Sequence, residues 1–418
     1  MNPTPDRAVD TRPLRAVALA TAAVFLLNGS VVTAWISRLP ATRDRLNADP
    51  RTLGLILLMA GLGALLAMPV AGRVSGRIGS KPVVITTALV SGVALVLMSL
   101  APNAVLTGAT LFLFGATYGS WDVAMNIQGS HVDRRAGRDY MPRYHACWSL
   151  GSIVGAALGA LAAAVGIGLT VHFTIAAVVA VVLTVVVVLR WYTDDRDPIH
   201  DDSPVAHAKR GRLFTRRIAL IGVIMLCGVF IEGAAADWLA IYLHDDRGAS
   251  QSVAALGFAV FATAMTLSRF AGTGVIDRFG RARAVRAAGG LAALGITAAL
   301  ALPGLPGALL GVLFWGAGTA LVFPAAISAG GESPGRPADS IAAITTIGYG
   351  GFLLGPPLIG LVAGQVGLDR ALWVLPVLGV TIAVLSPAVA SPSPSSSARA
   401  PGAPPTVEAG DLREVARE

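Results

Sequence analysis

Long apolar stretches, separated by short polar segments, recur along the whole chain. Each is about as long as the roughly 20 residues that a helix needs to cross the ~30 Å hydrocarbon core of a bilayer. Because backbone groups in lipid must be hydrogen-bonded within their own segment, these stretches are expected to be helices. The pattern predicts twelve spans, at 14–36, 53–73, 82–101, 104–127, 143–165, 168–190, 217–241, 253–275, 284–302, 306–329, 338–363 and 370–390.

One long polar interval divides the spans into two sets of six. Residues 191–216 contain TDDRDPIHDDSP and then AKRGR, which is too polar to cross a membrane. We therefore predict an N-terminal six-helix half, 1–190, a cytoplasmic linker, 191–216, and a C-terminal six-helix half, 217–390. The remainder, 391–418, is rich in Ser, Pro and Ala and is expected to be a disordered cytoplasmic tail. The fold class is all-α and integral to the membrane.

Composition and charge placement agree with this class. Of 418 residues, 54% are hydrophobic and 13% charged, and the net charge is +8. A basic chain can bind nucleic acid, but 25 of the 32 Lys and Arg residues fall on the face that carries both termini and 6 on the other. This asymmetry follows the positive-inside rule, which predicts cytoplasmic termini. The excess of basic residues therefore reflects the orientation of the chain in the membrane, and no nucleic-acid partner is expected.

Two sets of matching segments indicate an internal repeat. GRIGSKPVV, from Gly76, resembles DRFGRARAV, from Asp277, at an offset of 201 residues. GATYG, from Gly115, matches GAGTA, from Gly316, at the same offset. Because each match lies six spans from its counterpart, the halves are predicted to be homologous and parallel.

Two parallel six-helix halves with these loops resemble the major facilitator superfamily. The family's signature between spans 2 and 3 is a Gly, three residues, an Asp, then Arg, any residue, Gly and Arg. The first copy here begins at Gly72 but has Gly76 in place of the aspartate. The second copy keeps Asp277 but has Thr273 in place of the leading glycine. The resemblance implies the major facilitator fold, alternating access and a monomer.

Three further features resemble the fucose–proton symporter branch of that family. These are the polar fourth span, His145 at the start of the fifth, and GPPLIG from Gly355. The combination is also similar to bacterial inner-membrane permeases of unassigned substrate. The resemblance implies proton coupling and a location in the bacterial inner (plasma) membrane, as a multi-pass protein in contact with the lipid bilayer.

The fourth span carries an aspartate inside an apolar run, in GSWDVAMNIQ, residues 119–128. An ionisable side chain in mid-membrane costs at least about 3 kcal/mol and normally faces protein or a wet cavity. Helical spacing places Asp122 and Asn126 on one stripe with small residues. Two hypotheses remain open: Asp122 handles a proton or the solute, or it pairs with Arg143 or Arg269 to hold the bundle together.

Other polar and aromatic residues within spans give further candidates. Asn28 and Glu232 occupy matching places in spans 1 and 7, where either a central site or polar helix packing would explain them. His145 is a candidate proton carrier or a hydrogen-bonded interfacial histidine. Trp121 and Tyr349 offer stacking faces for a sugar ring, or else lie in lipid or core. Asn28, Asn126, Trp121, Glu232 and Tyr349 are thus candidate substrate-binding residues, and Asp122, Glu232 and His145 candidate proton-coupling residues.

The doubled loop supplies the candidate gating residues. A short cationic turn can pair with an acidic group or a helix end in one state and lose that partner in the other. By family analogy, Arg77, Asp277, Arg278 and Arg281 have this role. The alternative is that the arginines only set topology.

No motif for catalysis, metal binding or ATP use is present in the sequence. It has no phosphate-binding Gly-Lys-Ser/Thr loop, no HExxH and no paired-cysteine spacing, so neither an enzyme nor a cofactor is expected. The prediction is a secondary active transporter that moves a small polar, sugar-like solute together with protons. The alternatives are proton-coupled drug or metabolite efflux, and a non-transporting membrane sensor or assembly factor on the same fold.

The charge asymmetry generates a first testable prediction. Single cysteines placed in 191–216 or after Ser391 are expected to resist a membrane-impermeant reagent added outside intact cells, and to react once the cells are opened. Efficient labelling of either segment from outside would overturn the predicted topology.

Overall fold

The computed structural model describes residues 13–137, 140–192, 215–332 and 337–391, and this part of the chain is almost entirely helical. The helices are α1 (Leu14–Ile36), α2 (Leu39–Leu46), α3 (Pro50–Ile78), α4 (Ser80–Leu100), α5 (Ala104–Ala136), α6 (Met141–Ala164), α7 (Leu169–Trp191), α8 (Arg216–Asp245), α9 (Gln251–Phe279), α10 (Arg281–Ala301), α11 (Gly304–Thr319), α12 (Val322–Gly331), α13 (Pro337–Val366), α14 (Leu368–Ala371), α15 (Val374–Leu385) and the short 3₁₀ helix η1 (Ser386–Val389).

The helices reproduce the predicted membrane spans. Eleven stretches in the described part of the chain are long and apolar enough to cross a membrane. The remaining span, predicted at 104–127, corresponds to α5, in which polar residues from Tyr118 onward follow an apolar first half. Thus α5 completes the expected set of twelve.

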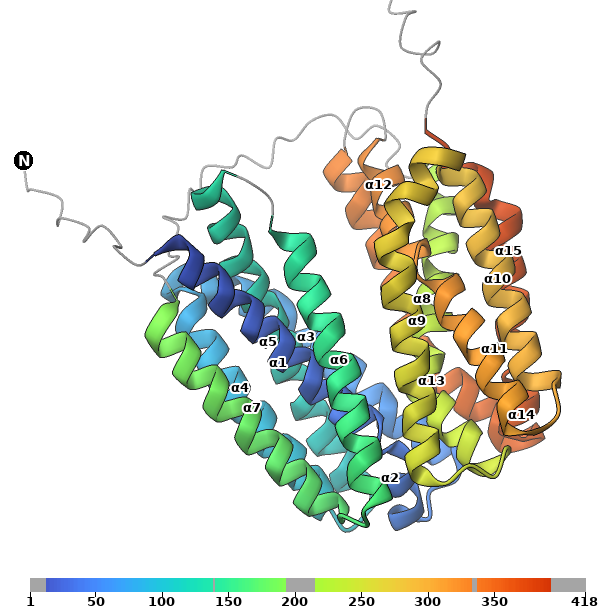
Figure 1. Cartoon of the computed structure of the whole chain (residues 1–418), viewed down its shortest axis with the longest axis horizontal. Helices are drawn as coiled ribbons and strands as arrows, with labels where there is room; N and C mark the ends of the chain where they lie inside the picture. Colours follow the sequence, from blue (N-terminus) through green and yellow to red (C-terminus); the bar gives the residue numbers. More distant parts are fainter. Residues whose placement is uncertain (1–12, 138–139, 193–214, 333–336, 392–418) are drawn as a thin grey trace, which may run out of the picture.

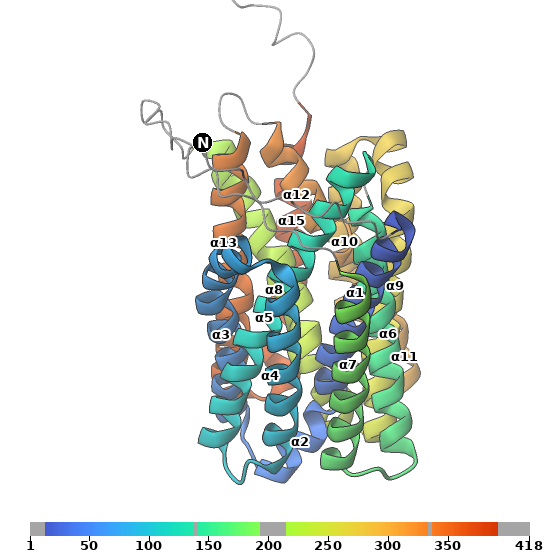
Figure 2. The ribbon, with the colours of Figure 1, turned by 90° about the vertical axis from the view of Figure 1, so that its left-hand side faces the viewer.

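The helices form two bundles that meet along two helix pairs. Helices α1–α7 form one half and α8–η1 the other, as Figures 1 and 2 show. Between them, α3 packs on α13 and α6 packs on α9. In Figure 1 the halves meet near α2 and diverge toward the end that carries the termini. We call these ends the α2 face and the terminal face. The linker and the tail lie mainly outside the described residues, so their predicted boundaries stay predictions.

The two halves repeat the same local structure at the predicted offset. Gly79, between α3 and α4, has φ 85°, and Gly280, between α9 and α10, has φ 80°. Glycine adopts this conformation without the steric cost that a Cβ would add. Just beyond, Lys81 donates to the carbonyl of Leu189 and Arg281 donates to that of Val389. Each half therefore ties the start of its third membrane span to the end of its last.

Small residues allow the helices within each half to approach closely. A Cβ on Gly115 of α5 would lie 2.0 Å from the carbonyl oxygen of Ala60 in α3. At the equivalent position, a Cβ on Gly316 of α11 would lie 2.3 Å from the carbonyl oxygen of Phe261 in α9. In lipid, where apolar side chains gain little by leaving the solvent, this close contact is a main source of helix association.

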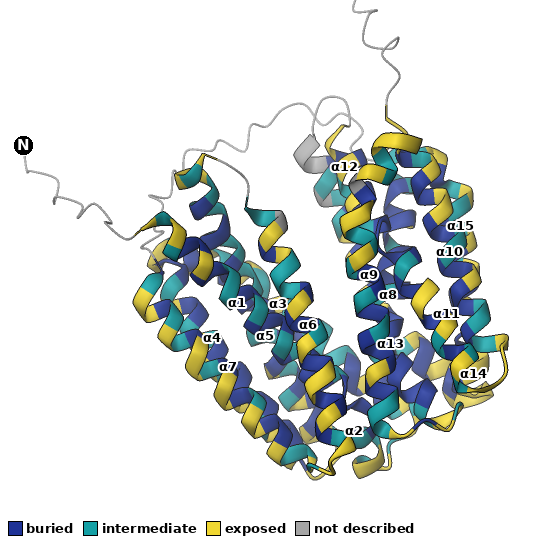
Figure 3. Cartoon of the chain, viewed as in Figure 1, coloured by how far each residue is buried: buried dark blue, intermediate teal, exposed yellow. Residues whose placement is uncertain are grey.

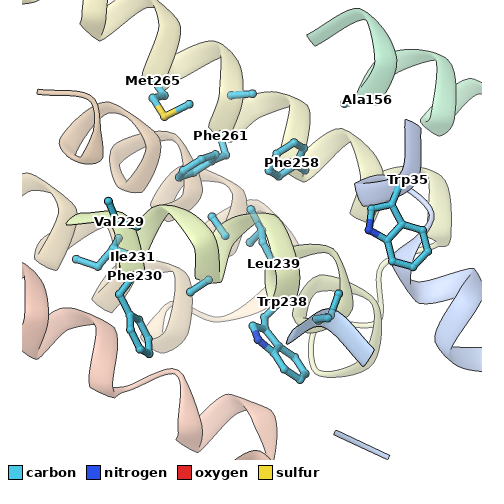
Figure 4. Packing of buried hydrophobic residues seen from close by; sticks show 14 of the residues in the cluster. Trp35, Ala156, Val229, Phe230, Ile231, Trp238, Leu239, Phe258, Phe261 and Met265 are labelled. Atoms are coloured by element: carbon cyan, nitrogen blue, oxygen red, sulfur yellow. The ribbon is translucent and has the colours of Figure 1, made fainter. Parts of the chain in front are cut away.

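Apolar side chains form both the core and the outer surface. Figure 4 shows Phe258 and Phe261 of α9 beside the segment of α8 that contains Ile231 and Trp238. Figure 3 shows exposed residues along the outer sides of α4 and α7. On α7 these are mostly apolar and recur at helical spacing, as in Val171, Ile175, Val178, Val182 and Val186. Such a large exposed apolar surface is what a protein in contact with lipid requires.

The structure differs from the predicted elements in two places. The loop after the first span contains an extra helix, α2, which ends at Asn47 with φ 45°. The predicted span 306–329 is interrupted at residues 320–321 and continues as α12. Pro324 lies in the first turn of α12, where its missing N–H removes no intrahelical hydrogen bond. Inside α13, by contrast, Pro356 and Pro357 do not end the helix.

The close contact at Gly115 generates a second prediction. Gly115→Ala is expected to destabilise the protein by about 1–3 kcal/mol, because the added methyl group overlaps the α3 backbone. Thermal unfolding in detergent measures this change. Gly290→Ala is the matched control, since no atom lies within 4 Å of its Cβ position. An equal stability of the two variants would show that α3 and α5 do not approach this closely.

Candidate functional site

The polar segment of α5 places three side chains on one face. Tyr118, Asp122 and Asn126 follow each other at intervals of four residues, which puts them one turn apart. The Asn126 amide Nδ2 donates to the Asp122 main-chain carbonyl (2.8 Å) and lies 3.4 Å from the Asp122 carboxylate oxygen Oδ1. The helix itself therefore orients the carboxylate.

A cavity of about 580 Å³ begins at Asp122 and extends toward the terminal face. Its lining mixes polar, charged and apolar residues and comprises Asp122, Val123, Asn126, Ile127, Ser130, Arg134 and Met141. Except for Met141, these residues belong to α5. The carboxylate thus lies on the wall of an open space, as a residue that exchanges protons or contacts a solute requires.

Aromatic and amide groups surround the Asp122 end of this cavity. Trp148 of α6 donates its indole Nε1–H to Asn28 Oδ1 of α1 (2.9 Å) and lies within hydrogen-bonding range of Tyr118. Asn28 is fully buried, and its Nδ2 has no partner among the described residues. Tyr349, on α13 of the other half, is close enough to interact electrostatically with Asp122. The site therefore includes groups from both halves.

The second charged group in the interior is an ion pair. Glu232 of α8 and Arg269 of α9 approach to 3.3 Å, and both side chains are partly exposed. His145, on α6 of the opposite half, interacts electrostatically with Arg269. Its ring also meets that of Phe25 edge to face, at 5.4 Å between centroids. The candidate proton carrier therefore lies on α6, which packs on the helix that carries Arg269.

These contacts remove both arginines suggested as structural partners of Asp122. Arg269 pairs with Glu232, and the Arg143 guanidinium lies 5.5 Å from the centroid of the Tyr140 ring. Within the described ranges, Asp122 makes no ion pair. In this state, therefore, neither arginine forms the ion pair with Asp122 that the structural hypothesis requires.

The two aromatic candidates differ in accessibility. Trp121 is 0% exposed and belongs to the core, whereas Tyr349 is 43% exposed. Trp121 is also absent from the lining of the cavity that its neighbour Asp122 lines. In this state only Tyr349 presents a ring that a solute can reach.

The candidate gating residues fall into two environments. Arg77, Asp277 and Arg278 are exposed on the terminal face, and none of them makes an ion pair with a described residue. Arg281 is 7% exposed and binds Glu332, with Nη1–Oε1 at 3.0 Å. It also donates to the Ser328 hydroxyl at 2.7 Å. Arg281 therefore joins α10, α12 and η1 within one half.

Sequence reasoning missed the contacts that close the α2 face. Arg43 of α2 pairs with Asp245 at the end of α8, across the two halves. Asp44 accepts a hydrogen bond from Gln251 of α9 at 3.3 Å. These residues lie in the short polar segments between predicted spans and have no spacing signal, so only the relative position of the halves identifies them.

Comparisons with known proteins agree with the fold. The family model of the major facilitator superfamily matches residues 16–356. The chain belongs to the major facilitator superfamily. An uncharacterized transporter of Sinorhizobium fredii, y4wD, is 35% identical over 368 residues, which cover 88% of this chain and 96% of that relative. The predictions of a multi-pass membrane transporter and of a protein that is not an enzyme are therefore confirmed.

Solved structures of this superfamily show the same twelve-helix fold. A mutant of the nucleoside transporter NupG superposes with a TM-score of 0.73 at 16% identity and covers 89% of this chain and 99% of that one. A variant of the Escherichia coli fucose:proton symporter FucP gives a TM-score of 0.57 at 16% identity, covering 90% and 98%. Identity this low supports the fold and leaves the substrate open.

The Arg281 cluster generates a third prediction. Arg281→Gln is expected to lower the free energy of unfolding by about 1–3 kcal/mol, because buried acceptors lose a charged donor. This expected loss is smaller than for a fully buried ion pair, because Glu332 is 37% exposed and solvent screens the interaction. Arg278→Gln, at an exposed position beside Phe279, is the control and should be neutral. If both variants unfold at the parent temperature, Arg281 does not stabilise the C-terminal half.

Proposed function

We propose that this transporter couples the movement of a small polar solute to protons, and that Asp122 carries the coupling proton. The supporting observation is an intramembrane carboxylate on a cavity wall with no ion pair among the described residues. An ionised group in such a place is costly, so neutralisation by a proton is favourable whenever the site is closed to water. Access that alternates between the two faces would then load and release the proton on opposite sides.

The groups around Asp122 favour a solute rich in hydroxyl groups. Asn126 offers an amide, Tyr118 a phenol, and Tyr349 a partly exposed ring from the other half. Amides and carboxylates bind hydroxyl groups through paired hydrogen bonds, and aromatic rings cover the apolar face of a sugar. The structural neighbours named for fucose:proton symport and nucleoside transport carry solutes of this kind.

The Glu232–Arg269 pair gives the C-terminal half its own role in the cycle. Both side chains are partly exposed, so a solute can reach them, and each is held by the other when no solute is present. His145 approaches Arg269 from the N-terminal half. We assign Glu232 to solute binding and, with His145, to proton transfer. A change in the spacing of the halves alters this electrostatic contact.

The cycle that we propose begins from the state in the structure, with the α2 face closed. The terminal face is assigned to the cytoplasm from the basic residues that it carries. Rocking of the halves about the Asp122 region would close that face and bring Arg77, Asp277 and Arg278 near new partners. We place the protein in the bacterial inner membrane, where a monomer contains the complete pathway.

A panel of labelled solutes tests the substrate class. Uptake and binding are measured in proteoliposomes with L-fucose, a nucleoside, sugar acids, amino acids and cationic dyes, with and without a proton gradient. Proton-driven movement of a hydroxyl-rich solute supports the proposal, in either direction. Transport of cationic dyes alone would instead support proton-coupled efflux, and binding without transport would indicate a sensor.

The fourth prediction concerns Asp122 itself. Asp122→Asn mimics the protonated carboxyl group, so it is expected to exchange solute between preloaded compartments at near the parent rate. It should fail to accumulate solute when a proton gradient is imposed. Asp122→Glu restores a carboxyl group and is the matched control, expected to recover part of the accumulation. A folded Asp122→Asn protein that still accumulates solute would remove Asp122 from the coupling and leave Glu232 as the candidate.

A further inference from the structure

The contact that closes the α2 face is an alternating set of charges from both halves. Arg43 of α2 holds two carboxylates: its Nη2 donates to Asp44 Oδ1 at 2.7 Å, and its Nη1 contacts Asp245 of α8. The second oxygen of Asp44, Oδ2, faces the C-terminal half. There it meets Gln251 Nε2 at 3.3 Å and His244 Nε2 at 3.5 Å. Asp44 is therefore the point at which α2 contacts both α8 and α9.

The protonation state of His244 follows from its second ring nitrogen. Nδ1 lies 2.7 Å from the main-chain carbonyl oxygen of Ala249, and a carbonyl oxygen can only accept a hydrogen bond. Nδ1 must therefore carry a hydrogen. In the neutral ring Nε2 then has only a lone pair, which would face the carboxylate of Asp44. The pair becomes attractive only when a second proton binds at Nε2.

The charge balance of the cluster leads to the same result. With His244 neutral, the cluster has one guanidinium, from Arg43, and two carboxylates, from Asp44 and Asp245. An imidazolium at His244 supplies the missing positive charge and adds an ion pair between the halves. Opening of the α2 face separates His244 from Asp44 and abolishes this pair.

The other charged groups near His244 belong to the loop that follows α8. Arg247 donates to the carbonyls of Ala299 and Leu300 and to the Tyr242 hydroxyl, so its charge is directed toward α10. Burial raises the pKa of Asp246, and the nearby Asp369 of α14 raises it further. Within the described residues, none of these groups forms a hydrogen bond or an ion pair with the His244 ring. In the described part of the chain, Asp44 remains its only acidic contact from another helix.

We propose that His244 makes closure of the α2 face depend on the pH of the compartment that this face contacts. The proposal rests on the alternation described above and not on the identity of the solute. A proton bound at Nε2 stabilises the closed α2 face through the ion pair with Asp44. This ion pair is absent when the α2 face is open. Lower pH on that side therefore shifts the equilibrium toward the state that opens at the terminal face.

The size of this effect is limited by solvent. The two side chains are 26% and 37% exposed, and ion pairs of that kind are weak and screened by salt. Protonation is therefore expected to change the ratio of closed to open molecules by about twofold to fivefold at low ionic strength.

A distance measurement across the α2 face tests the proposal without any solute. Spin labels are attached at Val165→Cys, in the N-terminal half, and Ala301→Cys, in the C-terminal half, after Cys147 and Cys227 have been replaced. Both label sites are exposed at the α2 face, Val165 in the turn after α6 and Ala301 as the last residue of α10. Double electron–electron resonance in lipid nanodiscs then gives the ratio of short to long distances near pH 5.5 and near pH 8.

Three variants separate His244 from the other titrating groups. His244→Gln keeps a hydrogen-bonding side chain of similar reach but has no charge at any pH, and it should lose the twofold to fivefold change that the parent shows. Asp44→Asn, which removes the acidic partner, should lose the same change. His131→Gln, at a histidine near the terminal face, should respond as the parent does. An equal response of the parent and His244→Gln, or a response that survives in Asp44→Asn, would overturn the proposal.

Discussion

The cost of an ionised group in lipid is the constraint on which the rest of this structure depends. On insertion scales one such group costs at least about 3 kcal/mol, so each charge in the bundle needs a partner, water or a proton. Arg281 has partners, because Glu332 and several carbonyl and hydroxyl oxygens surround it. Glu232 has Arg269. Asp122 has a cavity and the amide of Asn126, which leaves protonation as its means of becoming neutral.

The position of this carboxylate explains how the two halves can work together. Helices α3 and α13, and α6 and α9, form the contact between the halves, while the charged cluster of α2 and α8 closes one end. The cavity at Asp122 extends to the other end. A solute bound beside Asp122 would contact α5 of one half and Tyr349 of the other, so its binding energy can depend on their spacing.

Much of the fold could be predicted from the sequence because hydropathy and the repeat are local properties. The twelve spans followed from apolar length, and the offset between Gly76 and Asp277 predicted homologous halves, in which the turns at Gly79 and Gly280 are equivalent. Helix α2 was not predicted, because a helix of eight residues rich in charge has no membrane-length signal. The break after α11 falls inside the predicted span 306–329, since the residue that ends a helix depends on its neighbours.

The candidate site was predictable only where its residues share a helix. The four-residue spacing of Asp122 and Asn126 correctly placed both on one face of α5. The pairing of Glu232 with Arg269 joins two helices, so it depends on their rotation and depth, which spacing does not specify. The same reason explains why Trp148 was not connected with Asn28, and why Trp121 was considered for a site that its side chain does not face in this state.

The most direct test of the central claim is the movement of protons that accompanies solute. Proteoliposomes in weakly buffered medium, with no imposed gradient, receive a solute that the panel has identified, and a pH electrode records the outer medium. With the parent protein, inward movement of solute should carry protons with it and make the medium more alkaline. With Asp122→Asn the pH should stay constant while labelled solute still exchanges. Equal alkalinisation by the two proteins would contradict the assignment of the coupling proton to Asp122.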